Sequence, residues 1–375
     1  LGDQPAAALP EPVRRVLRRH LQVPSLWDEQ GVAGELRRLA QELPIDRVEC
    51  LWEPGMLLAA GLREALRLPG LTVAETVPFR DKEEMKRALD RAGIRTPRHA
   101  RAGSERACRE AAERIGYPLI VKPIAGAGSA DTHRLDAPAD LERVLPGLRH
   151  VPEVSVEEFI DGEEFTFDAV SIEGRLAYAG VCWYRPKPLW GRTIEWISPQ
   201  TVALRDLEAR ELQPGRAMGE AVLAALGFRT GFTHMEWFLT PRGEAVFGEI
   251  AARPPGARSV EIMNAAGDID LYRGWAEAVV KGRFSQPTRR LHNAIVVFKR
   301  ARGQGRIQRI EGLESLFCRY APHIVEVDLL PVGAARRDWK ATLLSDGHLI
   351  VRHPDLSRAL EIADRVGTDL RLYAA

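Results

Sequence analysis

Residues 231–253 restrict the fold of this chain more than any other stretch, because they read as two strands joined by a tight turn. The turn signal Pro-Arg-Gly stands at residues 241–243. If the turn is centred after residue 242, residues whose numbers sum to 485 face each other. Glu236 then lies opposite Glu249 on one face of the hairpin, with the two Cβ atoms about 5 Å apart.

Two carboxylates in this position repel each other unless a cation lies between them. Mg²⁺ fits such a place, because it takes one or two carboxylates and completes its octahedron with phosphates and water. A solvated hairpin face is the alternative. Phe238 and Phe247, expected on the acidic face, argue against plain exposure. The opposite face is apolar enough to pack on a core, with Met235, Trp237 and Ile250.

Arg253 follows the second strand with the same parity as Glu249, and the proline after it favours extended backbone. A guanidinium held there suits a phosphate or a carboxylate, which it binds through two parallel hydrogen bonds. An ordinary ion pair with either glutamate is the alternative.

A second motif joins a strand, expected at residues 117–123, to a loop of small residues. The strand ends near Lys122, and the loop contains Gly126, Gly128 and Ser129, whose backbone amides can surround phosphate oxygens. It is not a Walker A loop, because the lysine precedes the glycines and no helix follows them. A lone glycine-rich loop is more often a turn than a site, and the preceding lysine strengthens the phosphate interpretation.

A third motif places acidic residues on both sides of Asp-Gly at residues 161–162, a pair that predicts a hairpin between strands at 154–160 and 164–172. Backbone groups around residues 158–160 can pair with the edge of an adenine, and Glu164 can accept hydrogen bonds from ribose hydroxyls. A solvated strand edge is the commoner meaning of such a pattern.

The composition narrows the class of protein. In 375 residues, 53 Lys and Arg oppose 52 Asp and Glu, which argues against nucleic-acid binding through bulk charge. No apolar run is long enough for a membrane span, and no signal peptide is visible. The four cysteines have neither zinc-site spacing nor the density of a disulfide framework, so a reducing, cytoplasmic setting is expected. Only seven lysines occur, which makes each one more informative.

Periodicity and turn signals predict the order of the elements. Helices and strands alternate near the N-terminus, which indicates a small α/β unit, at 31–42, 46–52, 57–66 and 71–77. Strands and a further helix fill the middle of the chain. The stretch 186–199 reads as a loop, and short strands with a last helix at 356–366 form a C-terminal lobe.

In this order, the three motifs resemble the ATP-grasp superfamily of ATP-dependent ligases. Within it, the chain looks most like the carboxylate–amine ligases with a biotin-carboxylase-like layout. The resemblance covers about residues 79–282 and includes Asp81-Lys82 ahead of the lysine loop. It implies an α/β protein with the α+β ATP-grasp fold. An N-terminal α/β domain at 1–78, preceded in the family by a further strand–helix unit, would lead to an ATP-grasp domain at 79–285 and a mixed C-terminal lobe at 286–375.

The resemblance also implies a role for each matching residue. Lys82 and Lys122 would bind the phosphates of ATP, and the loop at 126–129 would close over them. Arg253, together with Lys122, would stabilise the reacting phosphate. Mg²⁺ (or Mn²⁺) would be held by Glu236 and Glu249. Adenine and ribose would be held by Glu157, Glu158, Ile160 and Glu164.

One position departs from the family pattern, which has Asn two residues after the second metal-binding glutamate. That position is Ala251 here, and the hairpin rule sets His234 opposite it. We therefore expect His234, or a water, to take the place of the missing ligand. A histidine hydrogen-bonded within the strand pair is the alternative.

The function implied is an ATP-dependent ligase. ATP would phosphorylate a carboxylate to an acyl phosphate, and an amine would convert it to an amide with release of ADP and phosphate. Two rivals stay open: a related carboxylase or formate-using enzyme, and a non-catalytic ATP-binding module. The candidate substrate residues are basic or aromatic and would lie near the site: Arg258, Arg192, Trp190 and His234.

The partners expected are small carboxylates and amines, with no nucleic acid and no membrane. Homodimers are common among proteins of this layout, although no residue of the sequence demonstrates one.

Overall fold

The computed structural model describes residues 1–125, 131–342 and 344–375. The chain divides into two units, Leu1–Arg80 and Asp81–Ala375. In the part of the chain that the structure describes, no helix has both the length and the apolar character needed to cross a membrane.

The first unit is built from helices around a small apolar cluster that includes Val32, Leu36 and Leu62. Asp28 caps the longest helix, where its Oδ1 accepts a hydrogen bond from the amide of Gly31 at 3.0 Å. The α-helices are α1 (Glu11–Val16), α2 (Glu29–Glu42), α3 (Met56–Leu66) and α4 (Val73–Thr76), and the 3₁₀ turns are η1 (Ala6–Ala8), η2 (Glu53–Gly55) and η3 (Val77–Phe79).

The strands predicted at 46–52 and 71–77 are wrong. Among the described residues of this unit, strand-type pairing occurs only as an isolated bridge between Gly2 and Gln22. Residues 73–76 instead form α4, because Thr72 and Glu75 make a capping box. The hydroxyl of Thr72 accepts from the Glu75 amide at 3.2 Å, and the Glu75 carboxylate accepts from the Thr72 amide at 2.9 Å. A short apolar run was therefore misread as a strand where a cap starts a helix.

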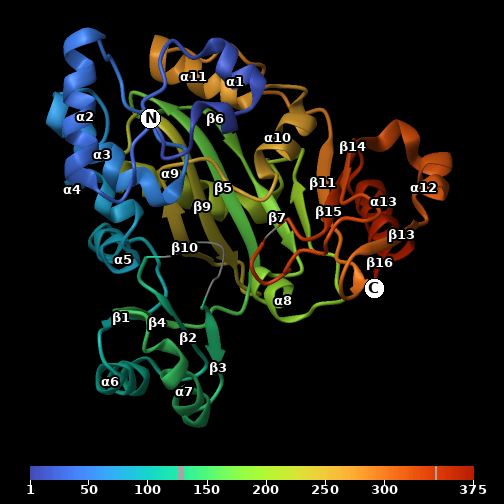
Figure 1. The fold of residues 1–375 in the computed structure, drawn as a ribbon. Helices are drawn as coiled ribbons and strands as arrows, with labels where there is room; N and C mark the ends of the chain where they lie inside the picture. The colour runs from blue at the N-terminus through green and yellow to red at the C-terminus, as the bar shows by residue number, and fades with distance from the viewer. Residues whose placement is uncertain (126–130, 343) are drawn as a thin grey trace. The chain divides into compact units, whose positions relative to one another are not determined.

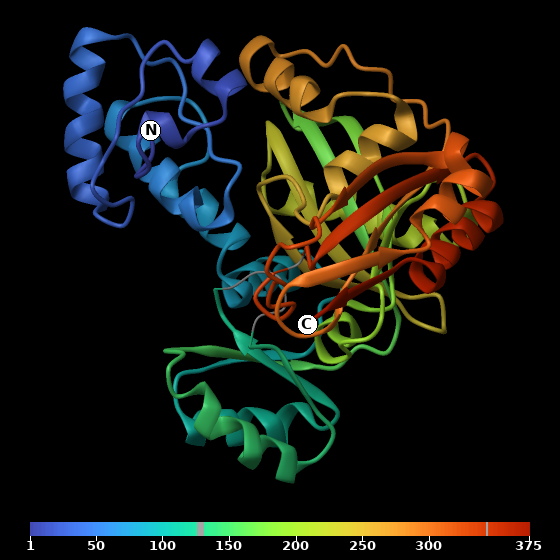
Figure 2. The same cartoon turned by 45° about the vertical axis from the view of Figure 1, so that its right-hand side comes forward.

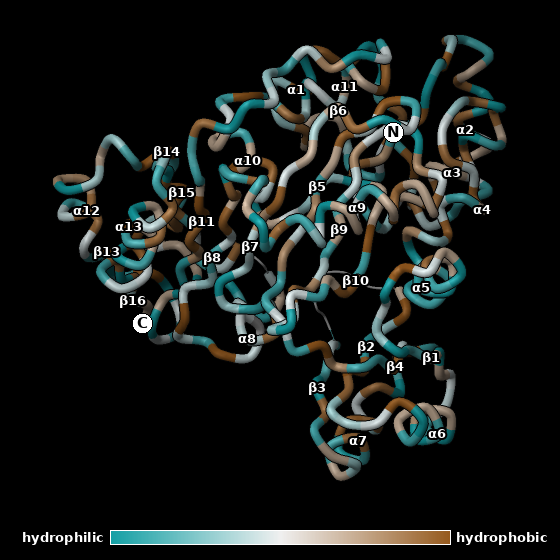
Figure 3. The backbone as a smooth tube through the Cα atoms, turned by 180° about the vertical axis from the view of Figure 1, so that it is seen from behind, coloured by the Kyte–Doolittle hydropathy of each residue, from teal (hydrophilic) through white to brown (hydrophobic). Residues whose placement is uncertain are grey.

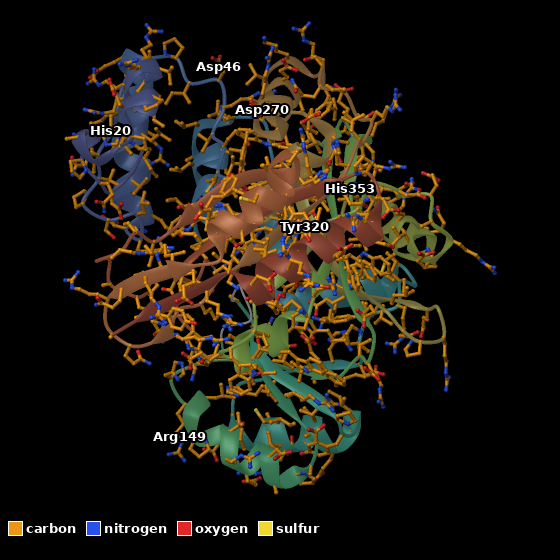
Figure 4. All side chains as sticks on the ribbon, turned by 90° about the vertical axis from the view of Figure 1, so that its right-hand side faces the viewer. His20, Asp46, Arg149, Asp270, Tyr320 and His353 are labelled. Atoms are coloured by element: carbon orange, nitrogen blue, oxygen red, sulfur yellow. The ribbon has the colours of Figure 1, made fainter. Side chains whose placement is uncertain are left out.

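The second unit contains a four-stranded antiparallel sheet with two helices on one face (Figure 1 and Figure 2). Arg149, on the outer side of this helical layer, pairs with Glu105 at 3.0 Å (Figure 4). The sheet runs in the order β1 (His99–Ala102), β4 (Val154–Glu158), β2 (Leu119–Pro123) and β3 (His133–Leu135), and it is covered by α6 (Glu105–Ile115), α7 (Pro138–Val144) and the 3₁₀ turn η4 (Leu145–Leu148).

A nine-stranded antiparallel sheet forms the rest of the core. Its strands are, in spatial order, β10 (Ala245–Ala251), β9 (Gly231–Leu239), β5 (Glu163–Ile172), β7 (Cys182–Arg185), β8 (Gln200–Ala203), β11 (Asn293–Phe298), β15 (Gly347–His353) and β14 (Ile324–Leu329), with β6 (Arg175–Gly180) paired to β5. β11 is buried along its whole length, and after Asn293 its residues are apolar (Figure 3).

The two faces of this large sheet have different helical covers. On one face, α10 (Ser259–Gly267) and α11 (Leu271–Lys281) pack on a cluster that includes Val170 and Cys182. On the other face, α9 (Gln213–Ala225) lies against the rings of Phe167 and Trp237. The short elements η5 (Arg210–Leu212) and α8 (Pro188–Thr193) join the strands, so the stretch predicted as a loop at 186–199 contains one turn of helix.

The C-terminal segment contributes to the same sheet, because β11, β15 and β14 continue it beyond β8. The boundary expected at residue 286 does not coincide with a break in the sheet, and a separate C-terminal domain remains a proposal. The segment adds a three-stranded sheet and further helices: β12 (Arg302–Gly303), β16 (Arg371–Ala374), β13 (Ile307–Glu311), α12 (Leu313–Tyr320), η6 (Ala321–His323) and α13 (Leu356–Asp369).

The hairpin predicted at Asp161-Gly162 is wrong. β4 belongs to the four-stranded sheet and β5 to the nine-stranded sheet, so the four residues between them cross from one sheet to the other. Gly162 fits this crossing because a Cβ there would lie 2.7 Å from the backbone oxygen of Leu239. The helix α5 (Lys82–Arg91) spans the same gap and contacts β1 and β10.

Candidate active site

The β9–β10 hairpin has the register predicted from its turn at the positions that matter for the site. Glu249 pairs with Glu236, and Ala251 pairs with His234. The register shifts by one residue at Gly248, where a Cβ would lie 2.8 Å from the backbone oxygen of Glu236. This β-bulge moves Phe247 opposite Trp237 and thus to the apolar face, so its expected place on the acidic face is wrong.

Polar side chains of β5, β9 and β10 share one face in three rows, because side chains alternate along each strand. β5 pairs with β9 and β9 with β10, which sets one residue of each strand in every row. From the covered end outward, the rows are Asp168, His234 and Ala251, then Thr166, Glu236 and Glu249, then Glu164, Phe238 and Val246. Three glutamates therefore lie on neighbouring strands of one face.

Two lysines reach this face from outside the large sheet. Lys82, at the start of α5, places its Nζ 3.4 Å from Oε2 of Glu249. Lys122, near the end of β2, places its Nζ 4.0 Å from the same oxygen. Asp81 fixes the start of α5, because its carboxylate accepts from the amides of residues 83 and 84, both at 3.0 Å.

The carboxylate of Glu157 joins a lysine of β2 and a lysine of the helix α5 into one network. It lies 3.0 Å from Nζ of Lys122 and 2.8 Å from Nζ of Lys86, and the hydroxyl of Ser155 donates to it at 2.8 Å. Although burial would raise the pKa of Glu157, the two lysines hold it well below its usual range. Glu157 is therefore ionised and fully engaged.

The glutamates of the face differ in charge. Burial would raise the pKa of Glu249, but Lys82 and Lys122 lower it to about 2. The pKa of Glu164 is instead raised well above its usual range, because burial and the charge of Glu236 disfavour its ionised form. The face thus holds one ionised glutamate beside the lysines and one glutamate whose ionised form is disfavoured.

His234 lies beside this group in a buried hydrogen-bonded chain. Its Nδ1 donates to Asp168 at 2.6 Å, and the other Asp168 oxygen accepts from the hydroxyl of Thr166 at 2.6 Å. Burial would lower the pKa of His234, but Asp168 raises it to about 9, and the nearby Arg253 opposes the rise. Its Nε2 lies 3.6 Å from the Glu236 carboxylate.

The carboxylates suit a hard divalent cation. Glu236 and Glu249 sit opposite each other with side chains 25% and 26% exposed, which leaves room for further ligands. The raised pKa of Glu164 marks a place where added positive charge would be favourable. Oxygen donors of this kind fit Mg²⁺ or Mn²⁺.

Residues 79–182 match the family model of the ATP-grasp domain. The chain contains an ATP-grasp domain. Its start coincides with the entry into α5, and the matched stretch holds both lysines and the Glu157 network.

Known proteins support this fold beyond the matched stretch. The chain superposes on an L-amino acid ligase from Bacillus licheniformis with a TM-score of 0.79, 23% identity, and coverage of 96% of this chain and 88% of that one. It also superposes on N5-carboxyaminoimidazole synthetase from Staphylococcus aureus complexed with ADP, with a TM-score of 0.67, 17% identity, and coverage of 96% and 87%.

In sequence, the chain is 26% identical over 239 residues to the L-arginine-specific L-amino acid ligase of Bacillus subtilis. The aligned stretch covers 61% of this chain and 56% of that protein. The chain spans about half the length of the curated relatives that it matches, 56% and 50% for two of them.

The structure brings together most of the residues that the resemblance implies for the ATP-grasp site. These residues are Lys82, Lys122, Glu157, Glu164, Glu236 and Glu249, with His234 and Arg253 beside them. Gly126, Gly128 and Ser129 lie outside the described residues, as does the side chain of Arg192.

Glu158, Ile160 and Trp190, which were also expected at the nucleotide or substrate site, have other surroundings in the structure. The amide of Glu158 donates to Arg98 O at 2.8 Å, and its carboxylate lies 3.2 Å from the guanidinium of Arg95. Ile160 is buried directly after β4. Trp190 is half exposed in α8.

Arg258 is not brought into this group. It pairs with Asp328 at 3.2 Å, and Asp328 belongs to β14, at the opposite edge of the sheet from β10. Its expected role as a carboxylate anchor at the cluster therefore has no geometric support.

Three residues of the network were not singled out from the sequence. Lys86 lies one helical turn after Lys82, and this i, i+4 spacing was the available signal. Asp168 and Tyr184 share the polar face, and the Tyr184 hydroxyl donates to Glu236 at 3.1 Å. The alternation of side chains along β5 and β7 places each residue on one face of its own strand. Which strands pair with the hairpin cannot be seen in the sequence, so neither residue could be assigned to the site.

Proposed function

We propose that this chain is an ATP-dependent carboxylate–amine ligase that forms an amide, peptide-like bond and releases ADP and phosphate. The observation that carries the proposal is the convergence of two lysines, from the helix α5 and from β2, with three glutamates of the large sheet, inside and next to the matched ATP-grasp segment. The similarity to amino acid ligases supports this reaction class over others.

The proposed reaction has two steps. A substrate carboxylate oxygen attacks the γ-phosphorus of ATP, the bond to ADP breaks, and an acyl phosphate forms. The amine nitrogen then attacks the acyl carbon, inorganic phosphate leaves, and the nitrogen loses a proton. Phosphoryl transfer requires mainly that the reacting groups are positioned and that their negative charge is neutralised, and lysine and arginine side chains can do both.

The residues divide this work. Lys82 and Lys122 hold the phosphates, and Arg253 compensates the charge that develops on the transferred group. Glu236 and Glu249 hold Mg²⁺ or Mn²⁺, which when bound neutralises and orients phosphate oxygens. For His234, Nδ1 is engaged by Asp168 and Nε2 faces the Glu236 carboxylate at 3.6 Å, which favours a role in positioning Glu236 over that of a metal ligand.

ADP release, measured with Mg-ATP and a panel of acids and amines offered singly and in pairs, tests the proposal. We expect ADP only with a particular pair, and a product whose mass equals the sum of the two minus one water. Tight ATP binding without ADP release for any pair would instead indicate a binding module.

A carboxylase is the second candidate, because one structural neighbour is an N5-carboxyaminoimidazole synthetase. ADP release with bicarbonate and one amine, and a product heavier than the amine by one CO₂, would favour it.

We also propose a reducing, cytoplasmic setting, since the four cysteines are free. A homodimer remains a proposal that light scattering can test.

A further inference from the structure

Lys86 is a fully buried lysine that cannot touch a ligand. Its side chain is 0% exposed, and its Nζ lies 2.8 Å from Oε1 of Glu157. The same Nζ donates to the backbone oxygen of Lys82 at 3.5 Å. Burial lowers the pKa of Lys86, and Glu157 opposes that effect. A charge in such a place needs a reason, because burying it is costly unless it is paired.

The pairing around Glu157 is asymmetric. One carboxylate oxygen faces Lys86 and the hydroxyl of Ser155, both at 2.8 Å, and the other faces Lys122 at 3.0 Å. Lys122 is 16% exposed and reaches the acidic face, whereas among the described residues Lys86 contacts Glu157 and the backbone oxygen of Lys82. Glu157 therefore has one partner that can turn toward a ligand and one that cannot.

Nucleotide binding would change these partners. Lys82 and Lys122 now approach Glu249, at 3.4 Å and 4.0 Å. If a metal ion occupies Glu249 and phosphates bind the lysines, each lysine exchanges a carboxylate for a phosphate. Glu249 gains the metal in return, but Glu157 lies on β4 in the other sheet and gains no cation to replace Lys122. Lys86 is then the cation that still faces its buried charge, beside the hydroxyl of Ser155.

We infer that Lys86 is a positioning residue that serves as the permanent counter-ion of Glu157, so that Lys122 is free to bind the phosphates of a nucleoside triphosphate. The inference rests on the proposed nucleotide site. Without Lys86, Glu157 keeps Lys122 as its cationic partner, and nucleotide binding must break that pair.

A double-mutant cycle on nucleotide affinity tests this inference. Lys86→Met, Glu157→Gln and the double variant are compared with the wild type by calorimetric titration with ATP and Mg²⁺ in the absence of acid and amine. In the wild-type background, we expect Lys86→Met to weaken ATP binding by at least about tenfold. In the Glu157→Gln background, the same substitution should change the dissociation constant by less than about threefold.

Equal factors in both backgrounds would show that Lys86 acts without Glu157 and would overturn the inference. Ser155→Ala supplies a milder variant should Lys86→Met fail to fold, because Ser155 donates to the same carboxylate oxygen. Its weakening of ATP binding should likewise disappear in the Glu157→Gln background, and an equal effect in both would contradict us.

The exposed Lys281→Met on α11 is the matched control and should leave affinity unchanged. A wild-type protein that binds no ATP would refute the proposed function itself, which separates that failure from a failure of the cycle.

Discussion

Glu164 and Glu249 are two carboxylates of one face with opposite pKa shifts. Lys82 and Lys122 hold Glu249 ionised, whereas burial and the neighbouring charge of Glu236 favour the protonated form of Glu164. Their positions explain the difference, since both lysines approach Glu249 directly. An incoming cation would thus meet an ionised ligand at Glu249 and would release a proton from Glu164 if it drew that residue in.

Removing either charge from the hairpin pair should remove the metal site. We expect Glu236→Gln and Glu249→Gln each to weaken Mn²⁺ binding in the presence of ATP by at least about tenfold and to lower the turnover number by about a hundredfold or more. Electron paramagnetic resonance of free Mn²⁺ measures the first effect, and ADP release measures the second.

Glu244→Gln is the control, because Glu244 is an exposed carboxylate at the turn of the same hairpin. Unchanged Mn²⁺ binding in both test variants would contradict the assignment of these glutamates.

The buried pair of His234 and Asp168 should make the stability of the ligand-free protein depend on pH. The folded pKa of His234, about 9, lies above its ordinary value of 6.5. Its contribution is complete below the unfolded pKa and is lost as pH rises from about 6.5 to about 9, up to about 3 kcal/mol. Denaturant unfolding at a series of pH values measures this slope.

His234→Gln should flatten the slope above neutral pH. His348→Gln serves as a control, since it removes another nearly buried histidine that also contacts a carboxylate. A wild-type stability that stays constant or rises between pH 7 and 9 would contradict the charge assigned to His234.

Sequence reasoning found the residues whose neighbours are local. The pairing of Glu236 with Glu249 depends on one turn and the bulge beside it, both local to the hairpin, and the number rule gave this pair although it missed the bulge. Lys86, Asp168 and Tyr184 were missed because their partners lie 71, 66 and 52 positions away along the chain. Such contacts depend on which strands become neighbours, and no local pattern determines that.

At the scale of elements, the bulge at Gly248 decides which side chains of β10 face the site. Without the bulge, the register of the pairs next to the turn, such as Phe247 with Trp237, would continue along both strands. Glu249 would then lie on the face opposite to Glu236, because side chains alternate along a strand. The simple rule of paired numbers could not foresee the bulge, since it assumes a regular ladder. The pairs next to the turn depart from the rule by one residue, and the bulge restores that residue before Glu249, so the rule still placed the glutamates correctly.

Gly248→Ala should damage both the hairpin and the metal site. The new Cβ would lie 2.8 Å from a backbone oxygen of β9, so the strands must separate or shift. We expect a loss of about 1–3 kcal/mol in the free energy of unfolding together with weaker Mn²⁺ binding. Denaturant unfolding and Mn²⁺ titration measure the two effects.

Gly147→Ala is the matched control, since its Cβ would meet nothing within 4 Å. Wild-type stability and metal binding in Gly248→Ala would show that the bulge is not required.

Other elements show where element prediction fails. Helices with clear caps were found, as at Ser104, whose hydroxyl accepts from the amide of residue 107 at 3.2 Å. The Asp161-Gly162 pair predicted a hairpin turn, but the chain crosses there to the other sheet. Turn residues indicate that the chain changes direction, and they do not indicate which strand the next strand pairs with. The expected strand at 71–77 failed because the capping box outweighed the apolar run.

At the scale of the whole molecule, all described residues of the candidate site belong to the unit Asp81–Ala375. We therefore predict that a fragment of residues 81–375 binds ATP with Mg²⁺ within about threefold of the affinity of the complete chain. Calorimetric titration gives the affinity, and circular dichroism with a cooperative thermal transition shows that the fragment is folded. A folded fragment without ATP binding would show that residues 1–80 contribute to the site.

The order of strands in the large sheet has a consequence for synthesis on the ribosome. The site strands β5, β9 and β10 are complete once residue 251 has emerged from the ribosome. β8 gains its second neighbouring strand only when β11 has been made, and β11 gains its second neighbour only when β15, which ends at residue 353, has been made. Until then, the nascent chain presents a strand edge with unpaired backbone groups. Chains that end after residue 253 but before residue 353 should therefore carry the site strands and Arg253 and still aggregate, so β11 and β15 protect this edge as well as completing the fold.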